Sequence, residues 1–185
     1  MDLVTTLQKS ADATVIVARG VRPEQFDEAT PCSDWNVQQL MNHLIGSLEY
    51  FGRQGQGKDA GRPEPPSPAS YEQTVRRLQE AARATAKAWS RPGALQQTVK
   101  TGFGDMPGSI LASMAVSEML AHTWDLAKAT NQKVPGTDIE LDDVLAVMHD
   151  TLKPEMRQPS FEAEVPAPAA AAPIERLVAF LGRQP

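Results

Sequence analysis

Long segments of helical periodicity, separated by clusters of proline and glycine, limit this chain to a mostly helical fold. Within the segments, apolar residues recur at spacings of three and four, whereas the two-residue alternation typical of strands is nearly absent. The predicted helices cover the ranges Leu3–Gly20, Trp35–Gly52, Ser70–Ser90, Pro107–Thr130, Leu141–Leu152 and Ile174–Arg183. Four longer helices and no evident sheet predict an all-α fold, a helix bundle.

The connections between the predicted helices are long. A Gly/Pro-rich loop covers residues 52–70, and a second irregular connection covers residues 91–109. Residues 96–101 could form a short extended piece, but no partner strand is evident. Ser33 or Asp34 is the predicted N-cap of the second helix. The sequence thus predicts one domain over residues 1–185, a four-helix bundle with short extra helices at its C-terminal end.

Composition excludes several classes of partner. The net charge is −5 and no block of Lys and Arg occurs, so we expect no nucleic-acid partner. No apolar run approaches membrane-spanning length and no signal peptide is evident, so we expect a cytoplasmic protein without a membrane partner. A single cysteine rules out an internal disulfide. The sequence leaves a monomer and a homodimer equally open.

Two histidines and a glutamate form the strongest candidate site. Glu118 and His122 are four residues apart, which places them one turn apart on the same helix face. That face is otherwise apolar or small, and a carboxylate buried there requires a partner or a cation. His43 lies at the edge of the apolar stripe of the second helix. If these two helices face each other, the three side chains converge in the core and could bind a divalent metal.

Other chemistry-bearing residues have structural interpretations. His149 lies near the end of its helix, where it meets the helix dipole favourably. Cys32 precedes the second helix, so a reactive thiol is conceivable, but a small buried residue is the favoured interpretation. Trp35 and Trp124 are expected in the core or in the wall of a site.

Alternatives remain open for the acidic residues. Asp125 could orient His122 through a hydrogen bond, or it could pair with Lys128 or Lys100 on the surface. An i,i+4 pair such as Glu118 and His122 is often only a surface or cap pair. A plain bundle, in which the three candidate ligands merely hydrogen-bond, is therefore one hypothesis.

At these residues the chain resembles a known family. The segment ATPCSDWNVQQLMNHLIGSLEYF, which contains His43, is similar to the first ligand segment of the N-terminal domain of mycothiol-dependent maleylpyruvate isomerase, a DinB-like helical fold. The segment SEMLAHTWDLAKAT matches the second ligand segment of that family and supplies Glu118 and His122. The terminal IERLVAFLGRQP resembles the tail of a short, mostly uncharacterised metal-binding subgroup. The resemblance implies that His43, Glu118 and His122 are metal ligands.

The resemblance also carries expectations about chemistry. Two imidazoles and a carboxylate suit zinc best, with nickel or iron as alternatives. The family implies mycothiol or another low-molecular-weight thiol as cosubstrate, and a thiol S-transferase or isomerase acting on a small electrophile. The isomerases carry a C-terminal domain that residues 141–185 are too few to replace, so their reaction does not transfer directly. The alternative function is a non-enzymatic protein that binds a metal or a small ligand.

Overall fold

A computed structural model describes residues 2–33, 35–58, 61, 69–102, 104–157, 161–168 and 170–185. Helices dominate these residues and a single hairpin accompanies them. The α-helices are α1 (Leu3–Gly20), α2 (Val37–Gly55), α3 (Tyr71–Trp89), α4 (Gly108–Ala129), α5 (Asp142–Thr151) and α6 (Pro173–Phe180). The short elements are the 3₁₀ turns η1 (Pro23–Gln25) and η2 (Pro154–Met156) and the strands β1 (Thr98–Thr101) and β2 (Gly104–Pro107).

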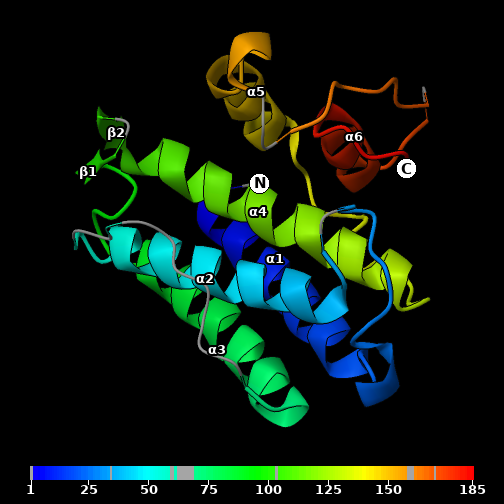
Figure 1. Cartoon of the computed structure of the whole chain (residues 1–185). Helices are drawn as coiled ribbons and strands as arrows, with labels where there is room; N and C mark the ends of the chain where they lie inside the picture. Colours follow the sequence, from blue (N-terminus) through cyan, green and yellow to red (C-terminus); the bar gives the residue numbers. More distant parts are fainter. Residues whose placement is uncertain are drawn as a thin grey trace.

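The first four helices form the expected bundle. Helices α1 and α2 each pack against both α3 and α4, so α1 and α2 lie at opposite corners (Figure 1). This arrangement puts α2 directly beside α4, which are the two helices that carry the candidate ligands. The all-α fold predicted from periodicity is confirmed.

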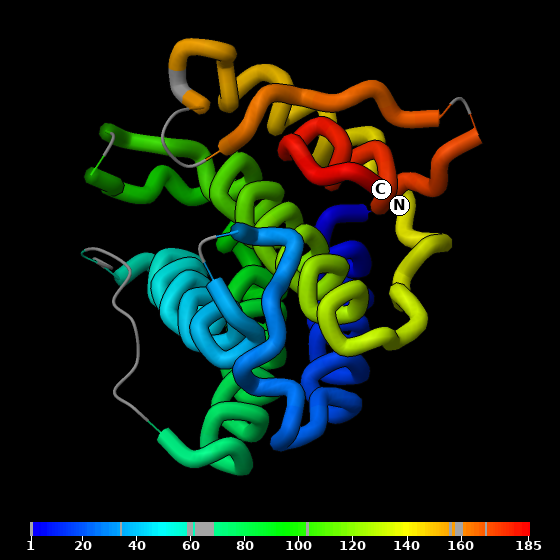
Figure 2. Tube along the Cα trace, turned by 45° about the vertical axis from the view of Figure 1, so that its right-hand side comes forward, coloured from blue at the N-terminus to red at the C-terminus, as the bar shows by residue number. Residues whose placement is uncertain are grey.

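Helix α4 is the central element of the structure. It has buried residues on every side, because α1 and α2 cover it from the bundle and α5 and α6 cover its outer side (Figure 2). A helix that is buried all round needs no amphipathic pattern. The Thr14 and Thr123 hydroxyls form a buried 2.9 Å hydrogen bond between α1 and α4, which fixes the rotation of α4 about its axis. Among the described residues, no helix is both long and apolar enough to cross a membrane.

The start and end of α2 differ from the prediction. Asn36, and not Ser33, caps the helix, and it forms a reciprocal capping box with Gln39. The other predicted cap, Asp34, lies outside the described residues. The helix also continues to Gly55 instead of ending at Gly52.

The glycines at the end of α2 allow close contact with α3. A Cβ atom at Gly52 would lie 3.3 Å from the hydroxyl oxygen of Thr85, and one at Gly55 would lie 3.0 Å from a ring carbon of Trp89. The Thr85 hydroxyl also donates to the Leu48 carbonyl at 2.7 Å. These glycines are therefore needed for helix packing, whereas the sequence alone placed them in a loop.

The expectation that residues 96–101 lack a partner strand is wrong. Strand β1 pairs with β2 in antiparallel register, with Thr98 opposite Pro107 and Thr101 opposite Gly104. Gly104 has a φ of +107°, which favours glycine, and its carbonyl accepts a hydrogen bond from the Thr101 hydroxyl. The hairpin is too short to show an alternating pattern, so periodicity could not reveal it.

Replacing Leu7 tests the packing of α1 in the bundle. Leu7 is fully buried, whereas Ile16 on the same helix is 59% exposed. We expect Leu7→Ala to lower the free energy of unfolding by about 2–5 kcal/mol and Ile16→Ala to change it by less than about 0.5 kcal/mol. Urea titration monitored by circular dichroism measures both values. Equal losses in the two variants would show that α1 is packed differently.

Candidate metal centre

The three predicted ligands converge between α2 and α4. His43 Nε2 lies 2.9 Å from Glu118 Oε1, and His122 Nε2 lies 3.6 Å from the same oxygen. One ligand atom from each of the three residues falls within 4.8 Å of the others. Ligands of zinc at about 2.0–2.1 Å in tetrahedral geometry stand roughly 3.3 Å apart, so the spacing suits such an ion.

The hydrogen-bonding pattern at His122 also fits a cation. Its Nδ1 lies 3.0 Å from Asp125 Oδ2, and an ionised carboxylate only accepts, so this hydrogen bond requires a proton on Nδ1. When Nε2 carries no proton, its lone pair faces the Glu118 carboxylate, which is also an acceptor. A cation between these two atoms would satisfy both of them.

Glu118 is held as an anion. Burial on its own would raise its pKa, but the charge of His122 and the hydrogen bond of His43 outweigh burial and lower the pKa to about 2. The carboxylate is thus ionised at any pH at which a metal would bind. An ionised carboxylate beside two imidazoles is a donor set suited to zinc.

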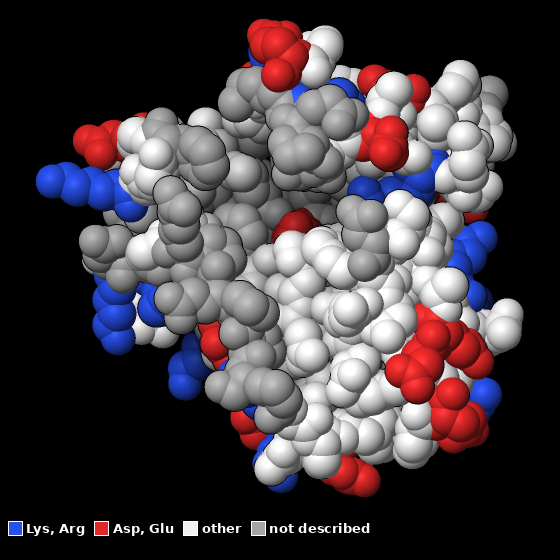
Figure 3. Space-filling model, in the orientation of Figure 1, with Lys and Arg blue, Asp and Glu red and all other residues white. Residues whose placement is uncertain are grey.

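The group formed by His43, Glu118 and His122 is more exposed to solvent at His43 than at His122. The side chain of His122 is 8% exposed, whereas those of Glu118 and His43 are 21% and 34% exposed. Figure 3 shows a hollow on the face where α2 and α4 meet, with an acidic side chain at its floor. Trp35 stacks on the His43 ring, with centroids 4.2 Å apart, and the Ser47 hydroxyl lies 3.5 Å from His43 Nε2. The predicted place of Trp35 in the wall of the site is confirmed.

Asp125 orients His122 and does not pair on the surface. Its side chain is 0% exposed, and Lys128 instead lies over the Trp124 ring, 4.9 Å from the centroid. Burial would raise the pKa of Asp125, but its hydrogen bonds with His122 and Arg183 outweigh burial and lower it. Of the alternatives left open by the sequence, the hydrogen bond to His122 is the one that forms.

Arg183 is the residue that sequence analysis missed. It follows α6, and its Nε and Nη2 lie 3.3 Å and 2.9 Å from the two carboxylate oxygens of Asp125. The Nη2 atom also lies 3.0 Å from Cys32 Sγ. The only signal in the sequence was a charged residue at the end of the predicted apolar helix Ile174–Arg183, and that signal does not name a partner.

Cys32, His122 and Asp125 form a second group of possible ligand atoms, but their surroundings disfavour a cation. The guanidinium of Arg183 already lies within 3.0 Å of both the Cys32 sulfur and the Asp125 carboxylate. A metal ion there would meet a fixed positive charge. The group therefore holds the Nδ1 side of the His122 ring, opposite the Nε2 atom that faces Glu118.

The third histidine, His149, lies away from the candidate site. His149 packs its ring against Phe180, with centroids 4.1 Å apart, in agreement with the structural role predicted for it.

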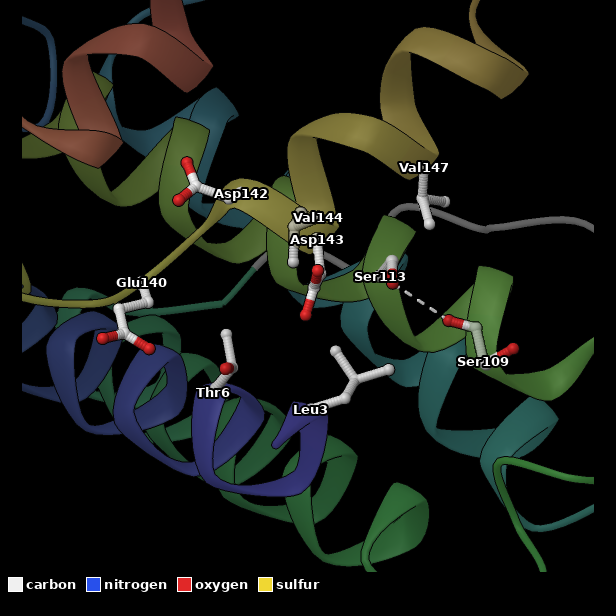
Figure 4. A pocket seen from close by; sticks show the side chains of 9 residues that line it. All are labelled: Leu3, Thr6, Ser109, Ser113, Glu140, Asp142, Asp143, Val144 and Val147. Atoms are coloured by element: carbon white, nitrogen blue, oxygen red, sulfur yellow. Dashed lines mark hydrogen bonds between the residues drawn. The ribbon is translucent and has the colours of Figure 1, made fainter. Parts of the chain in front are cut away.

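A separate pocket of about 490 Å³ opens between the start of α1, the start of α4 and α5 (Figure 4). Its lining is partly acidic and includes none of the candidate ligands: Leu3, Thr6, Ser109, Ser113, Glu140, Asp142, Asp143, Val144 and Val147.

A known family matches the part of the chain that contains the candidate site. The family described as the mycothiol maleylpyruvate isomerase N-terminal domain matches this chain over residues 7–127. The chain belongs to this family. The match spans the four bundle helices and all three candidate ligands, and it ends before α5, α6 and Arg183.

Relatives of similar length are known by sequence. Two uncharacterized proteins of Mycobacterium tuberculosis, from strains CDC 1551 / Oshkosh and ATCC 25618 / H37Rv, are each 33% identical over 188 residues. Each alignment covers 99% of this chain and 98% of the relative. The segment with α5 and α6 is therefore shared with relatives that have the same extent.

Two solved structures share the fold of the mycothiol maleylpyruvate isomerase N-terminal domain family. One is the mycothiol-dependent maleylpyruvate isomerase, with a TM-score of 0.54 and 19% identity. The other is a mutant of that enzyme with one histidine replaced by alanine, with a TM-score of 0.57 and 17% identity. Each comparison covers 80% of this chain and 68% of the other. The similarity confirms the DinB-like helical fold.

The environment of Cys32 predicts a thiol that reacts slowly with alkylating reagents. Burial raises its pKa to about 12 from an ordinary 9.0, and the charge of Asp125 adds to this effect more than that of Arg183 opposes it. A raised thiol pKa keeps the sulfur protonated at neutral pH, so we expect iodoacetamide to label the metal-free folded protein at least about tenfold more slowly than an ordinary cysteine. The rate should rise with pH up to about pH 10 without a plateau.

The same chain provides the control for this measurement, because Cys32 is its only cysteine. Unfolded in guanidinium chloride, the protein should react at the ordinary rate. A folded protein that labels as fast as the unfolded one, or a plateau near pH 9, would contradict the described environment.

Proposed function

We propose that this protein is a metal-dependent enzyme that uses a low-molecular-weight thiol of the mycothiol type on a small electrophile. The observation that carries the proposal is the convergence of His43, Glu118 and His122 on one point with an exposed side. Zinc is the metal that this ligand set suits best, and nickel or iron are the alternatives. The thiol is inferred from the family to which the chain belongs and from the name of its structural relatives.

Three protein ligands leave at least one coordination position for an exogenous molecule. A divalent metal held there would act as a Lewis acid that lowers the pKa of an approaching thiol. The resulting thiolate sulfur would add to an electrophilic carbon of an unsaturated carbonyl substrate while the carbon–carbon π bond breaks. Its electron pair would pass to the conjugated carbonyl as an enolate, which either takes up the proton released by the thiol or expels the thiolate again. In an isomerisation the thiol is released again, and in a transfer it stays attached to the product.

The residues of the chain supply position and charge. Glu118 contributes the negative charge of the site, and it is already ionised before a metal arrives. Asp125 accepts the Nδ1 proton of His122, which leaves Nε2 free to coordinate. Trp35 covers the face of the His43 ring and limits entry of water from that side. The hydroxyl of Ser47 lies 3.5 Å from His43 Nε2 and also hydrogen-bonds Glu118, so it helps to hold these two side chains in place.

Metal content tests the site directly. Protein purified with zinc should hold about one equivalent, measured by elemental analysis, because the three side chains form one ligand set. The variants His43→Ala and Glu118→Ala should each lose the metal while keeping their helical circular dichroism. The matched control is His149→Ala, which removes the third histidine of the chain from its contact with Phe180 and should leave the metal content unchanged.

Retention of metal by all three variants would mean that the group only hydrogen-bonds, as in a plain bundle. Loss of metal from His149→Ala alone would place the site elsewhere.

Turnover tests the chemistry. The zinc-loaded protein should consume mycothiol, or release it unchanged after isomerisation, with at least one member of a panel of small electrophiles. The panel should include maleylpyruvate, which is named for the structural relatives. His122→Ala should reduce turnover by a hundredfold or more, on the order of the effect of losing a metal that activates the nucleophile. A metal-loaded protein that binds thiol but converts no electrophile would support the alternative, a non-enzymatic metal- or small-ligand-binding protein.

A further inference from the structure

We propose that Arg183 is a positioning residue for the metal site, which holds Asp125 and Cys32 so that His122 presents Nε2 to the metal. This inference rests on the proposed metal at His43, Glu118 and His122. It assigns a role in that site to the segment after α6, which lies outside the residues matched by the family.

The first contact of Arg183 fixes the plane of a carboxylate. Its Nε lies 3.3 Å from Asp125 Oδ1 and its Nη2 lies 2.9 Å from Oδ2, so the guanidinium binds both oxygens. A two-point contact of this kind sets direction as well as distance. Oδ2 is the same oxygen that lies 3.0 Å from His122 Nδ1. Rotation of the Asp125 carboxylate would break its contacts to both residues at once.

The second contact of Arg183 reaches Cys32 in the loop that precedes α2. Nη2 lies 3.0 Å from Cys32 Sγ, and the thiol in turn donates to Asp125 Oδ2 at 3.3 Å. The loop that carries Cys32 is closed by a 2.9 Å hydrogen bond from the Trp35 amide to the Cys32 carbonyl. Trp35 stacks on His43, so the same arginine supports the surroundings of both histidine ligands.

The hydrogen bonds of Arg183 favour positioning over direct contact with a substrate. Within the described part of the chain, four hydrogen bonds engage it: two to Asp125, one to Cys32 Sγ, and one of 3.1 Å from Nη1 to the Leu181 carbonyl. Its side chain is only 12% exposed. A guanidinium used in this way is mostly engaged by the protein itself, which favours a positioning role over contact with a substrate.

Zinc affinity measured in chelator competition tests the proposal without any assay of turnover. We expect Arg183→Ala to weaken zinc binding by about tenfold, the lower end of the range typical when a direct partner of a ligating histidine is lost, because Arg183 acts on His122 through Asp125. Arg183→Lys should also weaken it, because a lysine is a point charge that cannot bind both oxygens of Asp125 and the Cys32 sulfur together. The matched control is Arg176→Ala, which removes an exposed 2.9 Å pair between α6 and Asp142 and should keep the wild-type affinity.

The ¹⁵N spectrum of histidine-labelled metal-free protein gives a second measurement. Wild-type His122 should carry its proton at Nδ1, as the contact with Asp125 requires, and Arg183→Ala should show a mixture of the two tautomers. A purely structural role would lower the unfolding free energy without changing this tautomer. If Arg183→Ala does not fold, the lysine variant decides the question by the same two measurements.

The outcomes separate this inference from the proposed function. Wild-type affinity and an unchanged His122 tautomer in both Arg183 variants would overturn the positioning role while leaving the metal site intact. A wild-type protein that binds no zinc, nickel or iron would overturn both. Weaker zinc binding in Arg176→Ala that equals the loss in Arg183→Ala would also overturn the positioning role, since the effect would then come from loosening of the whole C-terminal segment.

Discussion

Two carboxylates on α4, with one histidine between them, impose the constraint on which this structure depends. Glu118 faces one nitrogen of His122 and Asp125 faces the other. Charges placed inside a helical bundle need partners, because an unpaired buried carboxylate is far costlier than an unpaired amide or hydroxyl. Glu118 meets His43 of α2, and Asp125 meets Arg183 from beyond α6. The polar requirements of one helix thus bring three distant parts of the chain together.

The apolar contacts agree with this arrangement. Helix α4 is buried on all sides, so it needs a covering layer on its outer side as well as the bundle on its inner side. Helices α5 and α6 provide that layer, and the segment that shields α4 is the one that carries the arginine. Hydrophobic burial and charge pairing therefore favour the same placement of the C-terminal segment. Such agreement between hydrophobic burial and charge pairing is typical of sequences that fold to one structure.

Much of the bundle and the ligand group could be predicted from sequence, for a physical reason. His43, Glu118 and His122 lie within long helices, where a spacing of four residues determines which side chains share a face. The parts that could not be predicted depend on tertiary contacts. Gly55 indicates a loop by propensity, yet it serves the close approach of Trp89. Arg183 pairs with a residue 58 positions away, and no local pattern reports such a partner.

The cap of α2 is an intermediate case. Ser33, Asp34 and Asn36 are all good N-cap residues, and only Asn36 has a glutamine three residues later to complete a capping box. That pattern was present in the sequence and would have decided among the three. The hairpin, in contrast, has only four residues in each strand, which is too few for a periodic signal.

The contact between Cys32 and Arg183 has a consequence for the order of folding. These residues are 151 positions apart, whereas α2 and α3 are neighbours in the chain. Closing a long loop costs more conformational entropy than closing a short one, so contacts of this separation are expected to form late. The bundle would then exist before the surroundings of the two histidines are complete. The contacts of Arg183 with Cys32 and Asp125 would then be among the last to form, and a partly folded chain would lack the support that Asp125 gives to His122.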